Sequence, residues 1–375
     1  MLRGMTWDHP RGFDPLLACA ALWQARTGVR IEWERRSLQD FESFAVGELA
    51  GRYDLIVIDH PHVGQITRER CLVPLESAVD VALLGKEYVG ASLASYVWEG
   101  SLWALPIDAA AQVQAWRPDR LRSPPADWNA MLELAAAGEV LCPLRPPHNL
   151  MALFTLSGLE GSPGNVEGPD LLAPQGAGNA YERLRELAAL IDPACLAMDP
   201  IAVLERLSEP HCPCLCSPLV YGYVSYSRPR RESPALPAPI AFGDLPPLAP
   251  GGACGGSALG GTGIAVSARS AQREAAIRFA RWVAGAQAQC GPYLTAGGQP
   301  ASSAAWDDAA ANAASLDFYR NTRATLEGAW LRPRHAGYMP FQHAASERLR
   351  AALESGEPAR STIAAINRLY QQACV

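Results

Sequence analysis

The sequence lacks the features that define several large classes of protein. Lys and Arg form no long run among its 375 residues, and the formal net charge is −6, so the electrostatic footprint of a nucleic-acid-binding protein is absent. No apolar run approaches the roughly 18 residues that a membrane-spanning helix needs, so we expect no membrane insertion. Walker-type phosphate loops and nucleophile elbows are missing as well. Neither a metal site nor a cofactor is predicted.

A paired cysteine framework is also missing, although the chain has ten cysteines. In a chain of this length, that pattern favours a reducing compartment over a disulfide scaffold, and we expect no disulfide, Cys142–Cys195 included. Cys212, Cys214 and Cys216 alternate with other residues. Same-face residues of a strand lie about 6.6 Å apart, too far for three thiolates to share one zinc ion. We predict that these side chains are small buried hydrophobes.

No secretory leader is visible at the N-terminus. Such a leader needs a basic start, an apolar stretch and a small-residue cleavage site, whereas Met1–His9 runs straight into a predicted strand. The chain as written is therefore expected to be cytoplasmic, and periplasmic if a leader has been removed.

The first 75 residues alternate between strand and helix patterns. Strands are predicted at Leu2–Trp7 and Val29–Trp33, and helices at 14–27 and 38–50, the first of them starting with an Asp cap and a Pro at the first helical position. The continuous apolar run Leu55–Ile58 is typical of a strand covered on both faces. This alternation predicts a parallel sheet with helices on its faces.

The rest of the chain is less regular. A length of 375 residues favours two domains. Clusters of Pro and Gly indicate long connections, interrupted by predicted helices near 127–137 and 179–192. A strand pattern at 212–226 precedes a strand at 264–266 and a strongly amphipathic helix at 271–288.

Several segments stand in an informative order along the chain. They are Tyr53–Pro61, Leu72–Leu75, Gly100–Pro106, Gln112–Leu121, Gly260–Val266, Ala275–Val283, Gly297–Ala301 and the loose pattern of Arg332, Pro333 and Tyr338. Their order and spacing resemble those of the bacterial extracellular solute-binding proteins, family 1, which serve ABC importers of sugars and related solutes. One departure concerns the ligand, because Thr262 stands where many sugar binders of that family carry an aromatic residue.

The resemblance implies an α/β, two-lobed, periplasmic-binding-protein-like fold, with a sheet flanked by helices in each lobe and hinge crossovers between the lobes. It also implies a small-molecule ligand in the cleft, a monomer, and an ABC-transporter permease as partner. The expected N-terminal lobe is 1–107 plus 255–300, and the expected C-terminal lobe is 108–254 plus 301–375. The chain is expected to cross between lobes near 105–109, 254–262 and 295–305.

Candidate ligand residues follow the predicted strands, because ligands of open parallel sheets lie beyond the carboxyl ends of the strands. Asp8 and His9 follow the first strand, and Asp59 and His60 follow the third. Asp offers acceptors and His offers a donor or an acceptor. The alternative is that these residues only cap the helices that follow. Trp7 belongs either to the ligand site or to the core.

Further candidates come from the crossovers and the second lobe. Asp108 follows the first expected crossover and is either a ligand acceptor or a hinge partner. Ser257 lies in a stretch, 251–263, that holds seven glycines, which permit hinge motion and close approach to a ligand. Tyr221 is expected to point either into the cleft or into the core. Arg332 and Arg334 are candidates for a clamp on an acidic ligand, unless they lie in a solvated loop.

Three functions are compatible with these patterns. The favoured one is a substrate-binding component of an ABC importer that holds an organic acid or a sugar-like solute by hinge closure. The paired Asp and His residues motivate an alternative, a cytoplasmic enzyme that uses them for acid–base chemistry. An intracellular ligand sensor is the third.

Overall fold

The computed structural model describes residues 1–37, 46–77, 84–228 and 237–374. The helix predicted at 38–50 lies partly outside these residues, and only α3 (Val46–Ala50) falls within them.

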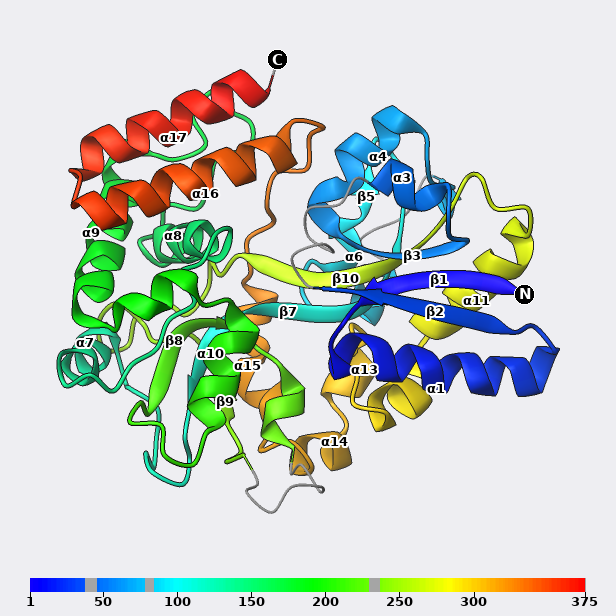
Figure 1. The fold of residues 1–375 in the computed structure, drawn as a ribbon, viewed down its shortest axis with the longest axis horizontal. Coiled ribbons are helices and arrows are strands. Elements are labelled where there is room, and N and C mark those ends of the chain that lie inside the picture. Colours follow the sequence, from blue (N-terminus) through cyan, green and yellow to red (C-terminus); the bar gives the residue numbers. More distant parts are fainter. Residues whose placement is uncertain (38–45, 78–83, 229–236, 375) are drawn as a thin grey trace.

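A mixed sheet runs through both lobes of the molecule (Figure 1). Its strands stand in the order β2-β1-β3-β10-β7-β8, and β9 also pairs with β7. As predicted, β1 pairs in parallel with both β2 and β3, whereas β10 runs antiparallel to β3 and β7. The strands are β1 (Leu2–Trp7), β2 (Ile31–Arg36), β3 (Leu55–Asp59), β7 (Leu105–Trp116), β8 (Cys216–Tyr221), β9 (Ala241–Gly243) and β10 (Leu259–Val266), with a small second sheet of β4 (Glu76–Ser77), β5 (Val97–Trp98) and β6 (Ser101–Leu102).

Buried apolar side chains form two separate cores, one in each lobe. Helices cover the sheet on the side of β1, β2 and β3 and also on the side of β7 and β8 (Figure 1). The N-terminal core includes residues of β1, β2 and β3, and the C-terminal core includes residues of β7 and β8. The N-terminal lobe carries α1 (Pro10–Thr27), α3, α4 (Val63–Glu69), α6 (Ser92–Ser95), α11 (Arg273–Ala284) and α12 (Ala286–Ala288). The C-terminal lobe carries α7 (Trp128–Ala136), α8 (His148–Leu159), α9 (Pro174–Leu190), α10 (Pro200–Ser208), α13 (Ser303–Trp306), α14 (Ala309–Ala313), α15 (Phe318–Glu327), α16 (Tyr338–Ser355) and α17 (Ala359–Ala373).

The long strands β7 and β10 run from one lobe to the other (Figure 1). In β7, Ile107 belongs to the N-terminal core and Ala109 to the C-terminal core. In β10, Leu259 belongs to the C-terminal core and Ile264 to the N-terminal core. Because both lobes share β7, their strands join in one hydrogen-bonded path rather than in two detached sheets. The two-lobed α/β architecture itself is confirmed.

Local signals explain several element boundaries. Helix α1 begins at Pro10, earlier than the predicted start at Asp14, because Pro10 occupies the first helical turn and the ring of His9 caps it. Gly28 ends the helix in the left-handed conformation at φ 74°. The predicted strand 212–226 is shorter, since β8 covers only Cys216–Tyr221.

Two further features concern the whole described chain. The thiols of all ten cysteines are free. Among residues 1–37, 46–77, 84–228 and 237–374, no helix combines the length and apolar character needed to traverse a bilayer.

Candidate ligand-binding site

A pocket lies between the lobes where β3, β10 and β7 meet. It holds about 720 Å³ of free space, counting the part that is open to solvent. The described residues that line it are Trp7, Arg11, Asp59, Asp108, Ala110, Pro147, His148, Met151, Pro200, Tyr221, Tyr223, Gly260, Gly261, Thr262, Arg332, Met339 and Gln342.

The floor of the pocket is a row of three residues on adjacent strands. Thr262 of β10 stands opposite Asp59 of β3 and opposite Asp108 of β7. Directly opposed residues of antiparallel strands point to the same face of a sheet, so the three side chains share the pocket face. The row therefore places a hydroxyl between two carboxyl groups.

Asp59 pairs with an arginine of the C-terminal lobe. Arg332 Nη2 lies 3.0 Å from Asp59 Oδ1 and 2.8 Å from Oδ2, and the guanidinium also donates to Leu259 O and Gln342 Oε1. Burial works to raise the pKa of Asp59, but the charge of Arg332 and a hydrogen bond from His60 outweigh it and hold that pKa well below its usual range. The Arg332–Asp59 ion pair therefore joins the two lobes.

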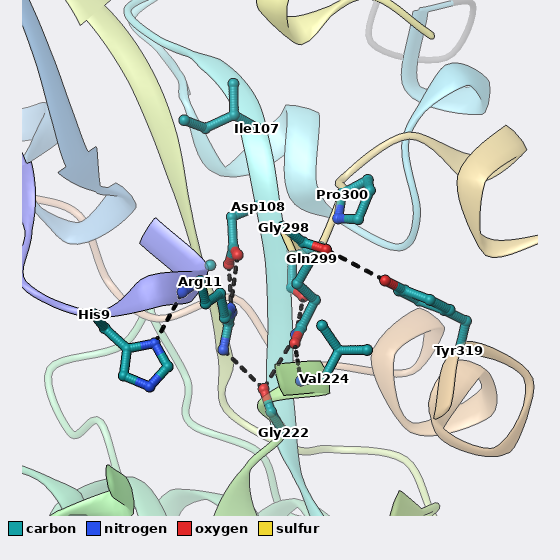
Figure 2. A network of polar contacts seen from close by, with 12 residues as sticks. His9, Arg11, Ile107, Asp108, Gly222, Val224, Gly298, Gln299, Pro300 and Tyr319 are labelled. Atoms are coloured by element: carbon teal, nitrogen blue, oxygen red, sulfur yellow. Dashed lines mark hydrogen bonds and ion pairs between the residues drawn. The ribbon is translucent and has the colours of Figure 1, made fainter. Parts of the chain in front are cut away.

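Asp108 pairs with Arg11, which lies in the first turn of α1 (Figure 2). Arg11 donates from Nε to Asp108 Oδ2 at 2.8 Å and from Nη2 to Oδ1, and its Nη1 donates to Gly222 O at 2.8 Å. The guanidinium carbon also lies 4.3 Å from the ring centroid of Tyr223. Burial raises the pKa of the Asp108 carboxyl, and the charge of Arg11 opposes that rise. Arg11 thus connects the N-terminal lobe, the crossover and the C-terminal lobe.

Gln299 joins three chain segments behind this pair (Figure 2). Its Nε2 donates to Ala109 O at 2.7 Å and to Gly222 O at 3.1 Å, and its Oε1 accepts from Val224 N at 2.9 Å. The carbonyl of Gly222 therefore receives hydrogen bonds from both Arg11 and Gln299. This network fixes the position of the Arg11–Asp108 pair relative to the crossover.

Two polar atoms in the pocket lining lack a hydrogen-bond partner among the described residues. They are Oγ1 of Thr262 and Nδ1 of His148. Burial lowers the pKa of His148 to about 4, so its ring is neutral at neutral pH. The His148 ring lies 6.4 Å from that of Tyr221, measured between centroids. Buried unpaired polar atoms cost free energy, so these two atoms are the lining groups whose hydrogen bonding the described residues leave incomplete.

The structure brings half of the sequence-predicted residues into the pocket lining. Those that line it are Trp7, Asp59, Asp108, Tyr221 and Arg332. Those that lie outside the lining are Asp8, His9, His60, Ser257 and Arg334. Of the four residues in the two Asp–His dipeptides, only Asp59 lies in the pocket lining.

In the first Asp–His pair, His9 caps the N-terminus of α1. Nδ1 of His9 accepts from the backbone N of Arg11 at 3.1 Å, and the ring packs edge-on against Tyr223 at 4.9 Å between centroids. Asp8 is exposed and lies 3.2 Å from Arg35. The capping alternative thus accounts for His9.

The other three residues outside the lining have structural partners. His60 is fully buried, and its Nδ1 lies 3.2 Å from Asp59 Oδ1. Ser257 donates to Gln112 O at 2.8 Å. Arg334 donates from Nη1 to the carbonyls of Ala94, Ser95 and Val97 at 2.7, 3.1 and 2.8 Å, so it attaches the C-terminal lobe to the N-terminal lobe beside the pocket.

The sequence did not lead to Arg11 or His148 as lining residues. It singled out Thr262 for its lack of an aromatic ring but not as a hydrogen-bonding group. Arg11 carries no local signal, since its partner lies 97 positions away. His148 follows Pro146-Pro147 at the start of α8, and a histidine beginning a helix after two prolines could have been recognised as a loop-end candidate. Within the described residues, no group of three or more His, Cys, Asp or Glu side chains is arranged to hold a metal ion.

Comparisons with known proteins agree with this architecture. No family model matches the sequence. MalE3 of T. maritima, solved with maltose, has a TM-score of 0.80 at 16% identity, with 99% of each chain covered. A solute-binding protein of an ABC transporter from Thermotoga lettingae, bound to α-D-tagatose, has a TM-score of 0.79 at 12% identity and covers 100% of this chain and 99% of its own.

A third structure is a solute-binding protein of an ABC transporter from Agrobacterium radiobacter K84, in complex with ribitol. Its TM-score is 0.75 at 16% identity, with 99% of this chain and 98% of that chain covered. The fold of this chain is therefore that of ABC-transporter solute-binding proteins over its whole length, and the resemblance found in the sequence is confirmed at the level of the fold.

Proposed function

We propose that this protein captures a small, neutral, hydroxyl-rich solute in the pocket between its lobes and delivers it to an ABC importer. The observation that carries the proposal is the composition of the pocket, to which both lobes contribute side chains around a row of polar groups. Pockets at domain interfaces that combine apolar walls with a few placed polar groups are typical ligand sites. Three of the solved structures with this fold hold maltose, ribitol and tagatose.

The charge arrangement favours a neutral solute over an organic acid. Among the described lining residues, both guanidinium groups already have a carboxyl partner, in the pairs Arg11–Asp108 and Arg332–Asp59. The ring of His148 is uncharged at neutral pH because burial lowers its pKa to about 4. A buried anion needs an uncommitted cation to offset its desolvation. The pocket supports hydroxyl recognition instead.

The proposed contacts follow from the unpaired atoms and the aromatic walls. Thr262 Oγ1 and His148 Nδ1 are buried without a hydrogen-bond partner among the described residues, and we assign them to hydrogen bonds with solute hydroxyls. Trp7, Tyr221 and Tyr223 offer ring surfaces to the C–H faces of the solute. A solute held in this way contacts both lobes, so it binds the closed conformation better than the open one and drives closure.

The proposed working unit is one chain, since both lobes belong to it. We assign its N-terminal lobe to 1–107 plus 255–300 and its C-terminal lobe to 108–254 plus 301–375, with hinge motion at the crossovers. The proposed protein partner is the permease of an ABC importer, which places the protein on the periplasmic side of the membrane. Sedimentation of the purified protein tests the monomer.

The test of the function is mass spectrometry of small molecules released when the purified protein is denatured, followed by titration of the refolded protein with the solute found. We expect a sugar or polyol that binds at one saturable site and is recovered unchanged after long incubation. Conversion of the solute to a product would establish the enzyme alternative. A released carboxylic acid would contradict the neutral class of solute.

A further inference from the structure

The two ion pairs of the pocket also bear on the length of the solute. We propose that Arg332–Asp59 and Arg11–Asp108 are end walls that restrict the pocket to a solute of one sugar ring or one linear polyol of similar size, and exclude its glycosylated forms. This inference rests on the proposed function and adds a limit on solute size.

One end of the pocket is closed by Arg332. Its guanidinium reaches from the C-terminal lobe to Asp59 with two contacts of 2.8 and 3.0 Å, and its side chain is only 5% exposed. Arg334 strengthens the closure just outside the pocket by donating to three backbone carbonyls of the N-terminal lobe. The backbone of 334–336 also packs against Gly64, where an added Cβ would lie 2.0 Å from Arg334 O. A solute cannot pass this end unless the two lobes separate there.

The opposite end is closed by Arg11. Its side chain is 4% exposed, and that of its partner Asp108 is fully buried. The hydrogen bond from Arg11 Nη1 to Gly222 O joins it to the C-terminal lobe (Figure 2). The Tyr223 ring, whose centroid lies 4.3 Å from the guanidinium carbon, adds a second contact to that lobe. The ring of His9 packs against Tyr223 behind the pair. At this end, several packed side chains therefore join the N-terminal lobe to the C-terminal lobe.

The distance between the walls follows from the strand register. Asp59, Thr262 and Asp108 occupy matched positions on three neighbouring strands, and neighbouring strands are about 4.8 Å apart. The two wall carboxyls thus arise from backbone positions about 10 Å apart. Thr262 lies between them and also lines the pocket. His148 lines the C-terminal side of the same space.

The experiment is isothermal titration calorimetry of the full chain with matched pairs of neutral solutes. The pairs are glucose and maltose, fructose and sucrose, and sorbitol and maltitol, each pair differing by one glucosyl unit. For every unit that binds, the glucosylated partner is expected to bind at least about 100-fold more weakly. Tagatose and ribitol extend the single-unit set, and gluconate is the charged control for sorbitol.

The outcomes separate this inference from the proposed function. A glucosylated partner that binds as tightly as its unit, or more tightly, would overturn the end-wall inference and leave solute capture intact. If no neutral member of the series binds, the proposed class of solute is wrong, and the inference is overturned with it. Binding confined to single units supports both.

Discussion

The pair formed by Arg332 and Asp59 allows the most detailed prediction. The Asp59→Asn variant keeps an oxygen that can accept from the backbone N of His60 but removes the charge that compensates a guanidinium only 5% exposed. Breaking a buried ion pair by removing one partner costs about 3–5 kcal/mol. We expect Asp59→Asn to lower the free energy of unfolding by about 3 kcal/mol, and Arg332→Met to lower it by a similar amount.

The double variant distinguishes the loss of the Arg332–Asp59 interaction from destabilisation caused by each substitution alone. With both charges gone, neither group is left buried without a partner, so the double variant is expected to lose at least about 2 kcal/mol less than the sum of the single losses. The assay is urea denaturation at pH 7, followed by tryptophan fluorescence. Arg3→Met provides the matched control, because the Arg3–Glu34 pair is half exposed at 49% and 51%, and we expect no measurable change.

Two results would refute this reasoning. Single variants within about 1 kcal/mol of the wild type would mean that the Arg332–Asp59 pair is solvated in solution rather than buried. Strictly additive losses would mean that the two side chains do not interact.

Three further predictions concern the pocket. Thr262→Val removes the hydroxyl at nearly constant volume and is expected to weaken solute binding about tenfold, or 1.4 kcal/mol, measured by calorimetry, with thermal stability maintained. His148 has a folded-state pKa of about 4 against about 6.5 when unfolded, so the unfolded chain takes up its proton first and stability falls as the pH drops from 6.5 to 4. In His148→Gln, the free energy of unfolding should fall by about 3 kcal/mol less between pH 6.5 and pH 4 than in the wild type, measured by urea denaturation across that pH range. An equal pH dependence in the two proteins would contradict the burial of the His148 ring. Arg334→Met removes three lobe-to-lobe hydrogen bonds and is expected to increase the radius of gyration of the unliganded protein in small-angle scattering, whereas Arg30→Met on the surface is not.

Local patterns were sufficient to place part of the site. The apolar run that ends at Asp59 predicted a strand end at the pocket, because a strand covered on both faces directs the residue after it to the sheet edge. The crossover segment likewise led to Asp108. In both cases the deciding information lies within a few residues of the side chain that lines the pocket.

The arginine partners could not be found in this way. Arg11 and Asp108 are 97 positions apart, and Arg332 and Asp59 are 273 positions apart, so their pairing exists only once the lobes are packed. His9 shows a different kind of error. The helix start was predicted at Asp14, but Pro10 is also suited to the first helical turn, and the longer helix makes His9 its cap.

Solute binding in the pocket between the lobes is tested most directly by calorimetric titration of two tryptophan variants with the solute identified by mass spectrometry. Met339→Trp places a large ring in the pocket lining, whereas Leu132→Trp changes a half-buried position of α7 outside that lining. We expect one saturable site in the wild type, unchanged affinity in Leu132→Trp, and affinity at least about 100-fold weaker in Met339→Trp. Wild-type affinity in Met339→Trp, or no saturable binding in the wild type, would show that solute does not bind in this pocket.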